Sequence, residues 1–246
     1  PQSWVDFFQY HDANYTYKNS EDPAHSYYWR GYNEYYFGGP DCSGYVGWVV
    51  YNLMNTESGN DGYVMSASKM AGSFADEGWG QLLSDGVKDF QPGDIFSMSG
   101  HVWMCLGTCE DGSVVFLHST PSDSKTGQPG GGVQLSALDP DGNVDCQAYQ
   151  LVSHYMSTYY PQWSQRYDAV LRDYESYTTV SGGQFRWDLS GVISDPDGYA
   201  NMTADEILAD LFGGSQEQSV VYLGVQDYGT VTSKDKSNFT HLFSVN

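Results

Sequence analysis

The chain has 246 residues, of which 40% are hydrophobic, enough for one large packed domain. It carries only 10 Lys and Arg against 31 Asp and Glu, which gives a net charge of -21. This balance argues against nucleic acid and anionic membrane surfaces as partners, because both require cationic side chains. No apolar run approaches the length of a membrane-spanning helix, so we expect no membrane insertion.

The start of the chain and its acidity bear on its location. The sequence begins at Pro1, with neither an initiator Met nor a signal peptide. We interpret it as a mature or trimmed product from which a secretion signal has been removed. An acidic composition fits a soluble secreted protein, although acidic cytosolic proteins also exist. We therefore expect a secreted or cell-wall-associated protein.

Hydrophobic periodicity and turn signals predict a mixture of helices and strands. The first 34 residues are rich in Tyr, Trp and Phe and have no clear period. The residues 203–206, Thr-Ala-Asp-Glu, form a capping-box pattern before an apolar run that Gly213-Gly214 ends. Predicted helices cover 42–54, 64–76, 161–174 and 207–212, and predicted strands cover 95–98, 101–106, 114–118, 132–136 and 220–225.

The stretch Asp41-Cys42-Ser43-Gly44 is the most informative part of the chain. It follows a Gly-Gly-Pro turn and opens the apolar run of the predicted helix 42–54. Cys42 would then lie at a helix N-terminus, where unpaired amides and the helix dipole favour a thiolate. Because the thiolate is the nucleophilic form of cysteine, Cys42 is a candidate catalytic residue.

Two histidines on a predicted hairpin could serve this nucleophile. His101 begins one strand and His118 ends the next, with an Asp-Gly turn between the strands. A cysteine nucleophile needs a base, and the base needs an orienting group. We predict His101 as the base and His118 as its orienter, provided that the strand register puts both on one face. The remaining histidines, His11, His25, His154 and His241, we interpret as structural.

The other cysteines and the acidic turns have simpler interpretations. Cys105 lies in an apolar strand and fits a buried thiol, whereas Cys109 and Cys146 flank turns and could form a disulfide. Carboxylates alternate in 139–145 and 195–198, but the glycine is not where an EF-hand requires it. We interpret both segments as ordinary turns. A zinc site formed by Cys42, His101 and His118 is allowed by ligand type but is disfavoured, so we expect neither a metal nor a cofactor.

Five segments in order resemble the NlpC family of bacterial cell-wall cysteine peptidases. The segment 35–46 is similar to the family's nucleophile motif, and 91–96 is similar to its strand-entry motif. The segment 101–107 resembles the strand that bears the base, and 116–119 resembles the strand that bears the third polar residue. The segment 132–138 resembles the one that usually follows. Only Pro40 separates Gly38-Gly39 from Asp41, fewer residues than the family usually has there.

The resemblance implies an α+β fold, with a papain-like core in which an N-terminal nucleophile helix packs on an antiparallel sheet. It implies Cys42 as nucleophile, His101 as base and His118 as the third residue. It further implies an oxyanion and substrate-binding region at Tyr35, Asp41 and Ser43, to which the Cys42 amide contributes. The domain would cover 25–175, between an extension at 1–24 and a C-terminal extension at 176–246 that packs on or beside the core.

The activity implied by the resemblance is hydrolysis of peptidoglycan stem peptides, at the bond between γ-linked D-Glu and the diamino acid. The aromatic N-terminus could line the groove or pack internally. One alternative keeps the fold and the three residues but makes the protein an amidase or acyltransferase. Another is a non-catalytic cell-wall or surface binding protein that retains the motif. The sequence leaves the oligomeric state and the purpose of 176–246 open.

Overall fold

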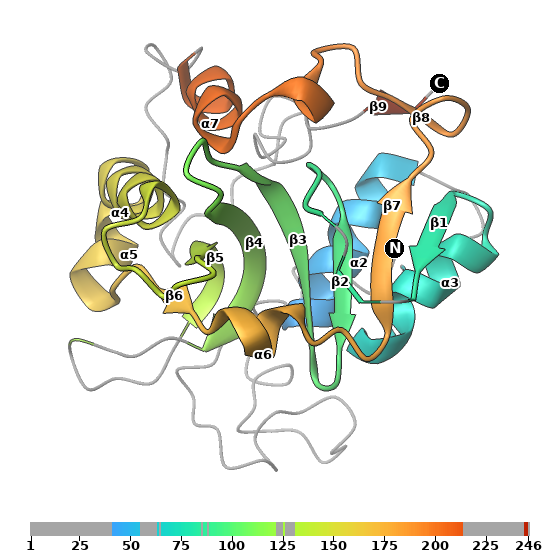
Figure 1. Cartoon of the computed structure of the whole chain (residues 1–246), viewed down its shortest axis with the longest axis horizontal. Helices are drawn as coiled ribbons and strands as arrows, with labels where there is room; N and C mark the ends of the chain where they lie inside the picture. Colours follow the sequence, from blue (N-terminus) through green and yellow to red (C-terminus); the bar gives the residue numbers. More distant parts are fainter. Residues whose placement is uncertain are drawn as a thin grey trace, which may run out of the picture.

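The computed structural model describes residues 41–54, 63, 65–84, 86–87, 89–121, 125, 131–213 and 244–245. Its centre is a seven-stranded sheet in the order β1-β7-β2-β3-β4-β5-β6 (Figure 1). All neighbouring strands are antiparallel except β5 and β6. The protein is thus a mixed α/β structure with a mostly antiparallel sheet, as the sequence predicts.

The strands of this sheet come from both halves of the chain. They are β1 (Gly80–Leu83), β2 (Ile95–Met98), β3 (His101–Thr108), β4 (Val114–Pro121), β5 (Gly131–Leu138), β6 (Leu171–Arg172) and β7 (Gly183–Trp187). A separate pair joins β8 (Ile193–Ser194) to β9 (Ser244–Val245). The helices are α2 (Cys42–Met54), η3 (Ala67–Lys69), α3 (Met70–Asp76), α4 (Gln147–Tyr159), α5 (Pro161–Arg166), α6 (Tyr174–Thr178), η4 (Tyr199–Asn201) and α7 (Ala204–Gly213).

The larger core lies between one face of the sheet and the helices α2, α3, α4 and α7. Because side chains alternate along a strand, Val102, Met104 and Leu106 of β3 all face this core and are at most 4% exposed. The helix α2 contributes Val46 and Val50, which are fully buried there. In Figure 1, α2 runs behind β2 and β3. Burial of this apolar face holds the start of α2 against the middle of the sheet.

The opposite face of the sheet carries a smaller, aromatic core. Phe96, Trp103 and Phe116 are fully buried, and the rings of Phe96 and Trp103 stack with centroids 3.8 Å apart. The short helix α6 supplies Tyr174 and Tyr177 to this cluster. Figure 1 shows α6 crossing the front of the sheet near the ends of β3 and β4. The two faces of β3 are therefore buried by different elements.

Most predicted elements are confirmed, and the differences have local causes. The helix 42–54 and the strands 95–98 and 101–106 appear where they are predicted. The capping box also forms, since Thr203 N donates to Glu206 Oε2 over 2.8 Å and Glu206 N donates to Thr203 Oγ1 over 3.3 Å. The helix predicted over 161–174 is wrong in length, because α5 ends at Arg166 and is followed by β6. The predicted strand 220–225 lies outside the described residues.

The segment that follows residue 175 contributes directly to the sheet. β7 lies between β1 and β2, and its pairing with β2 places Phe185 beside Ile95. The helix α7 packs on β3. The boundary at 175 itself stays a prediction, but the described part of 176–213 completes the fold. Among the described helices, none is both long and apolar enough to cross a membrane.

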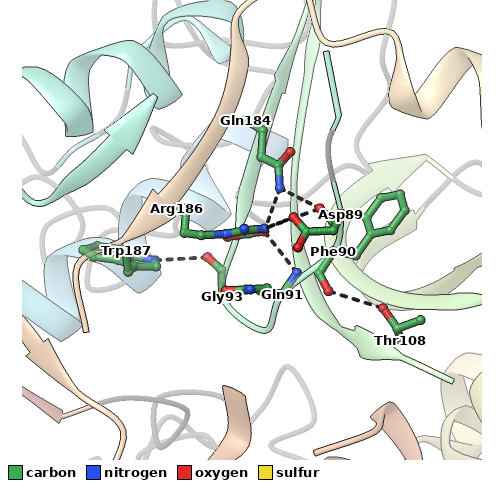
Figure 2. A network of polar contacts seen from close by, with 9 residues as sticks. Asp89, Phe90, Gln91, Gly93, Thr108, Gln184, Arg186 and Trp187 are labelled. Atoms are coloured by element: carbon green, nitrogen blue, oxygen red, sulfur yellow. Dashed lines mark hydrogen bonds and ion pairs between the residues drawn. The ribbon is translucent and has the colours of Figure 1, made fainter. Parts of the chain in front are cut away.

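A buried ion pair joins β7 to the entry of β2 (Figure 2). The carboxylate of Asp94, which is 1% exposed, accepts hydrogen bonds from Arg186 Nε over 3.0 Å and from Arg186 Nη2 over 2.6 Å. Gln184 Nε2 and the amide of Gln91 also donate to it. Burial raises the pKa of Asp94 despite Arg186, so this carboxylate depends on its donors to remain charged.

We predict that Arg186→Met lowers the free energy of unfolding by about 3 kcal/mol, because it leaves the buried Asp94 carboxylate without its cation. Urea denaturation of the wild type and the variant measures this. Lys125→Met is the matched control. It removes an ion pair with Asp168 whose side chains are 42% and 71% exposed, and such pairs contribute about 1 kcal/mol or less. Equal losses in both variants would contradict a structural role for the buried pair.

Candidate functional site

The structure brings His101 and His118 together on one face of the sheet. Cys105 of β3 pairs with Phe116 of β4, so these two residues and the alternate residues next to them share a face. His101 Nε2 and His118 Nδ1 lie 2.8 Å apart, which is a hydrogen bond. The register that the sequence could not determine thus puts both imidazoles on the aromatic face.

Beyond His118, the chain of hydrogen bonds continues onto β5. His118 is 0% exposed, and its Nε2 lies 3.0 Å from Ser136 Oγ. Gln134 Nε2 in turn donates to Ser136 Oγ over 3.1 Å. Both residues are buried. Sequence reasoning missed them, although both lie in the segment 132–138 and their alternate spacing places them on one face of a strand.

Cys42 lies where the start of α2 meets the start of β3. Its sulfur is 4.0 Å from the carbonyl oxygen of Gly100, to which the thiol donates. A hydrogen bond from the backbone amide of Val102 favours its thiolate form. The sulfur therefore contacts the backbone on both sides of His101. Because His101 is the first residue of β3, its side chain can meet a helix that packs on the opposite face.

Asp41 and Ser43 have a structural role at this helix start. Asp41 Oδ1 accepts from the amide of Gly44 over 2.7 Å and from Ser43 Oγ over 3.0 Å. Asp41 is therefore the N-cap of α2, and it holds the turn that presents Cys42. Its role and that of Ser43 in substrate binding stay predictions. Tyr35, predicted as an oxyanion donor, lies outside the described residues.

Electrostatics at Cys42 oppose the thiolate, contrary to what its position at a helix start predicts. Burial of the sulfur raises its pKa most, and the negative charge of Asp41 raises it further. Amides of Cys42, Ser43 and Val102 lower the pKa, but by less. The reason is that Cys42 itself is partly buried, so desolvation of its sulfur outweighs the amides. Cys42 therefore rests as a thiol at neutral pH.

The two imidazoles are also held neutral. Burial lowers the pKa of His101 to about 4, the positive charge of Arg172 lowers it as well, and Asp41 opposes both. The pKa of His118 is lowered well below its ordinary value by burial first, and then by His101 and Arg172. At neutral pH the site consequently contains a thiol and two uncharged imidazoles.

Tyr177 of α6 covers this pair of imidazoles. Its ring centroid lies 5.5 Å from that of His101 and 5.9 Å from that of His118. The guanidinium carbon of Arg172 lies 6.0 Å from the Tyr177 ring centroid. Burial raises the pKa of Tyr177 and the nearby Cys42 adds to this, so the phenol stays protonated. No sequence motif indicated either residue, because both reach the site through the fold.

The remaining candidates are structural. Cys105, Cys109 and Cys146 are buried free thiols, so no disulfide joins Cys109 to Cys146 in this structure. Asp139 accepts from the amides of residues 141 and 143, and Asp195 accepts from those of 199 and 200, as ordinary turn residues do. Within the described residues, no group of three or more His, Cys, Asp or Glu is arranged to hold a metal ion.

Comparisons with known proteins add no relative. No protein-family model matches the chain, no curated protein is significantly similar to it, and no solved structure matches its fold significantly. The fold and the site therefore define only a class: a mixed α/β protein with a hydrogen-bonded His101–His118 pair on central strands of a mostly antiparallel sheet, and with Cys42 against the backbone next to His101.

We predict that Asp41→Asn increases the rate at which iodoacetamide alkylates Cys42 at pH 7.5. Asparagine caps a helix as well as aspartate does, so the change removes the charge and retains the turn. Loss of the negative charge beside the sulfur lowers the pKa of Cys42, so a larger fraction of the thiol is ionised at this pH. Mass spectrometry of the alkylated peptide measures the rate, with Cys42→Ala as the blank. An unchanged or slower rate in the variant would show that Asp41 does not oppose the thiolate.

Proposed function

We propose that this protein is a secreted cysteine hydrolase that cleaves peptidoglycan stem peptides, with Cys42 as nucleophile and His101 as base. The observation that carries the proposal is the position of the Cys42 sulfur against the backbone on both sides of His101, whose Nε2 is bonded to the buried His118. The substrate, including the bond between γ-linked D-Glu and the diamino acid, comes from the resemblance to the NlpC family. Its location outside the cell follows from that substrate.

The residues present can perform an acyl transfer. Because Nε2 of His101 is occupied by His118, Nδ1 is the nitrogen that remains to take the thiol proton. The thiolate then attacks the amide carbonyl carbon, and His101 returns the proton to the leaving amine. A water molecule, deprotonated by His101, releases the acyl group from sulfur. The amides that favour the Cys42 thiolate are also placed to stabilise the oxyanion.

The architecture supports the proposal at the level of the core. A helix that begins at the nucleophile packs on an antiparallel sheet, and the adjacent strands of that sheet carry the base and its partner. This is the arrangement expected of a papain-like core. We therefore propose that α2 and β2 to β5 form such a core.

The decisive experiment is digestion of purified peptidoglycan and synthetic stem peptides by the wild type and by Cys42→Ala. We expect the alanine variant to lose all turnover above the blank, and His101→Ala to lose about 10²-fold or more. Masses of the released fragments identify the bond that is cut, and so separate a stem-peptide peptidase from an amidase. Equal turnover by the wild type and Cys42→Ala would overturn the proposal.

The pH dependence of kcat/KM should reflect the pKa of His101, which burial lowers to about 4. Protonated His101 cannot accept the thiol proton, so activity should fall as the pH drops through about 4. We predict that Tyr177→Ser moves this acid limb upward, toward the ordinary value near 6.5, because water then reaches the imidazole. Tyr174→Ser is the control, since Tyr174 lies on the same helix but contacts Phe90. An acid limb that does not move in Tyr177→Ser would contradict this role of the ring.

A further inference from the structure

His118 is a buried imidazole with one polar partner at each ring nitrogen. Nδ1 faces His101 Nε2 at 2.8 Å, and Nε2 faces Ser136 Oγ at 3.0 Å. A neutral imidazole has one nitrogen that donates and one that accepts. Its two hydrogen bonds must therefore run in the same direction along the chain, either toward His101 or away from it.

The hydrogen bonds of Ser136 indicate which direction satisfies every buried group. Its Nε2 donates to Ser136 Oγ, which leaves the hydroxyl proton of Ser136 to donate to His118 Nε2. His118 then carries its proton on Nδ1 and donates to His101 Nε2. In the opposite direction, Ser136 Oγ would accept from both Gln134 and His118, and its hydroxyl proton would have no hydrogen-bond acceptor among the residues that the structure describes. A buried unsatisfied donor is costly, so the first direction is favoured.

We propose that Ser136 is the positioning residue that sets the resting direction of the hydrogen-bond chain, beside a Gln134 that offers its hydroxyl proton no acceptor, so that His101 presents a protonated Nδ1 on the side of Cys42. This deepens the proposed hydrolase function and rests on it. In this state His101 cannot take the thiol proton on Nδ1. The base becomes competent when the direction reverses, which exchanges the proton on His101 Nδ1 for one on His118 Nε2 without a change in net charge.

The geometry explains why the thiol and the two imidazoles are uncharged in the resting state. A protonated Nδ1 of His101 cannot accept the thiol proton, which stays on the sulfur and is donated to the carbonyl oxygen of Gly100, so no thiolate–imidazolium pair forms at rest. His118, Ser136 and Gln134 are at most 2% exposed, so water does not replace any of their hydrogen bonds. The other charged or titratable groups at the pair are Asp41 and Arg172, which act on the imidazoles through their charge, and Tyr177, whose ring packs against both.

Nitrogen-15 NMR of histidine-labelled protein tests the direction directly, because long-range proton–nitrogen couplings distinguish the two neutral tautomers. In the wild type at pH 7 we expect a proton on Nδ1 of both His101 and His118. Assignment uses His101→Gln and His118→Gln, each of which removes one set of signals. A proton on Nε2 of His118 in the wild type would overturn the proposal.

Gln134→Glu provides the matched reversal. A glutamate oxygen accepts the Ser136 hydroxyl proton, so Ser136 Oγ can accept from His118, and we expect the proton of His118 on Nε2. Gln134→Met removes the donor without supplying an acceptor, so its tautomers should remain those of the wild type. An unchanged tautomer in Gln134→Glu, or a reversal in Gln134→Met, would contradict the assignment.

A second readout links the direction to the chemistry. Alkylation of Cys42 at neutral pH should be about tenfold faster in Gln134→Glu than in Gln134→Met, the factor that corresponds to one hydrogen bond. Ser113→Ala controls for loss of a buried serine, since Ser113 bonds Asp111 and Ala148 at the far end of β4. The NMR result holds or fails whether or not stem peptides are cleaved, so failure of this inference is distinguishable from failure of the proposed function.

Discussion

The buried Asp94–Arg186 pair is the constraint on which the sheet depends. It ties β7, from the second half of the chain, to the turn that enters β2, where Gly93 adopts the left-handed conformation that this turn requires. Trp187 Nε1 donates to the carbonyl of Gly93 and reinforces the same junction. A buried ion pair of this kind stabilises the fold little more than an apolar contact would. Removal of one partner, however, leaves the other as a buried, unpaired charge, which is strongly destabilising. It therefore specifies which strand enters the centre of the sheet.

From that junction the position of the site follows by strand pairing. Once β2 is held, its hairpin with β3 places Met98 opposite His101, so the first residue of β3 lies at the end of a central strand. The start of α2 is brought to the same strand end by packing of its apolar face on β3 and β4. His101 belongs by alternation to the aromatic face and Cys42 to the other. The two side chains can approach each other only at a strand end, which is where His101, the proposed base, lies.

Short-range sequence patterns predict the helix and the hairpin of the site, but not the contacts that tertiary packing makes. Cys42 at a helix start and the hairpin between His101 and His118 are read from neighbouring residues, and both are confirmed as local structure. Tyr177 and Ser136 reach the imidazoles through strand pairing and helix packing, and no short motif encodes such contacts. The position of Cys42 at a helix N-terminus is visible in the sequence. The burial of its sulfur, which raises the pKa of the thiol, depends on tertiary packing and is not visible there.

Burial disfavours the charged forms of Cys42, His101 and His118, and this affects how reactive the thiol is. A thiolate–imidazolium pair would be reactive toward any electrophile, whereas a thiol with neutral imidazoles is inert until its surroundings change. The aromatic face, with Trp103, Phe116 and Tyr177, provides the low-polarity environment that suppresses the charges. Under the proposed function, a substrate amide bound at the start of β3 would supply a carbonyl on which negative charge develops beside the Cys42 amide. The protein would then stabilise charge on the reacting substrate more than on its own resting side chains, which is the condition for catalysis by differential binding.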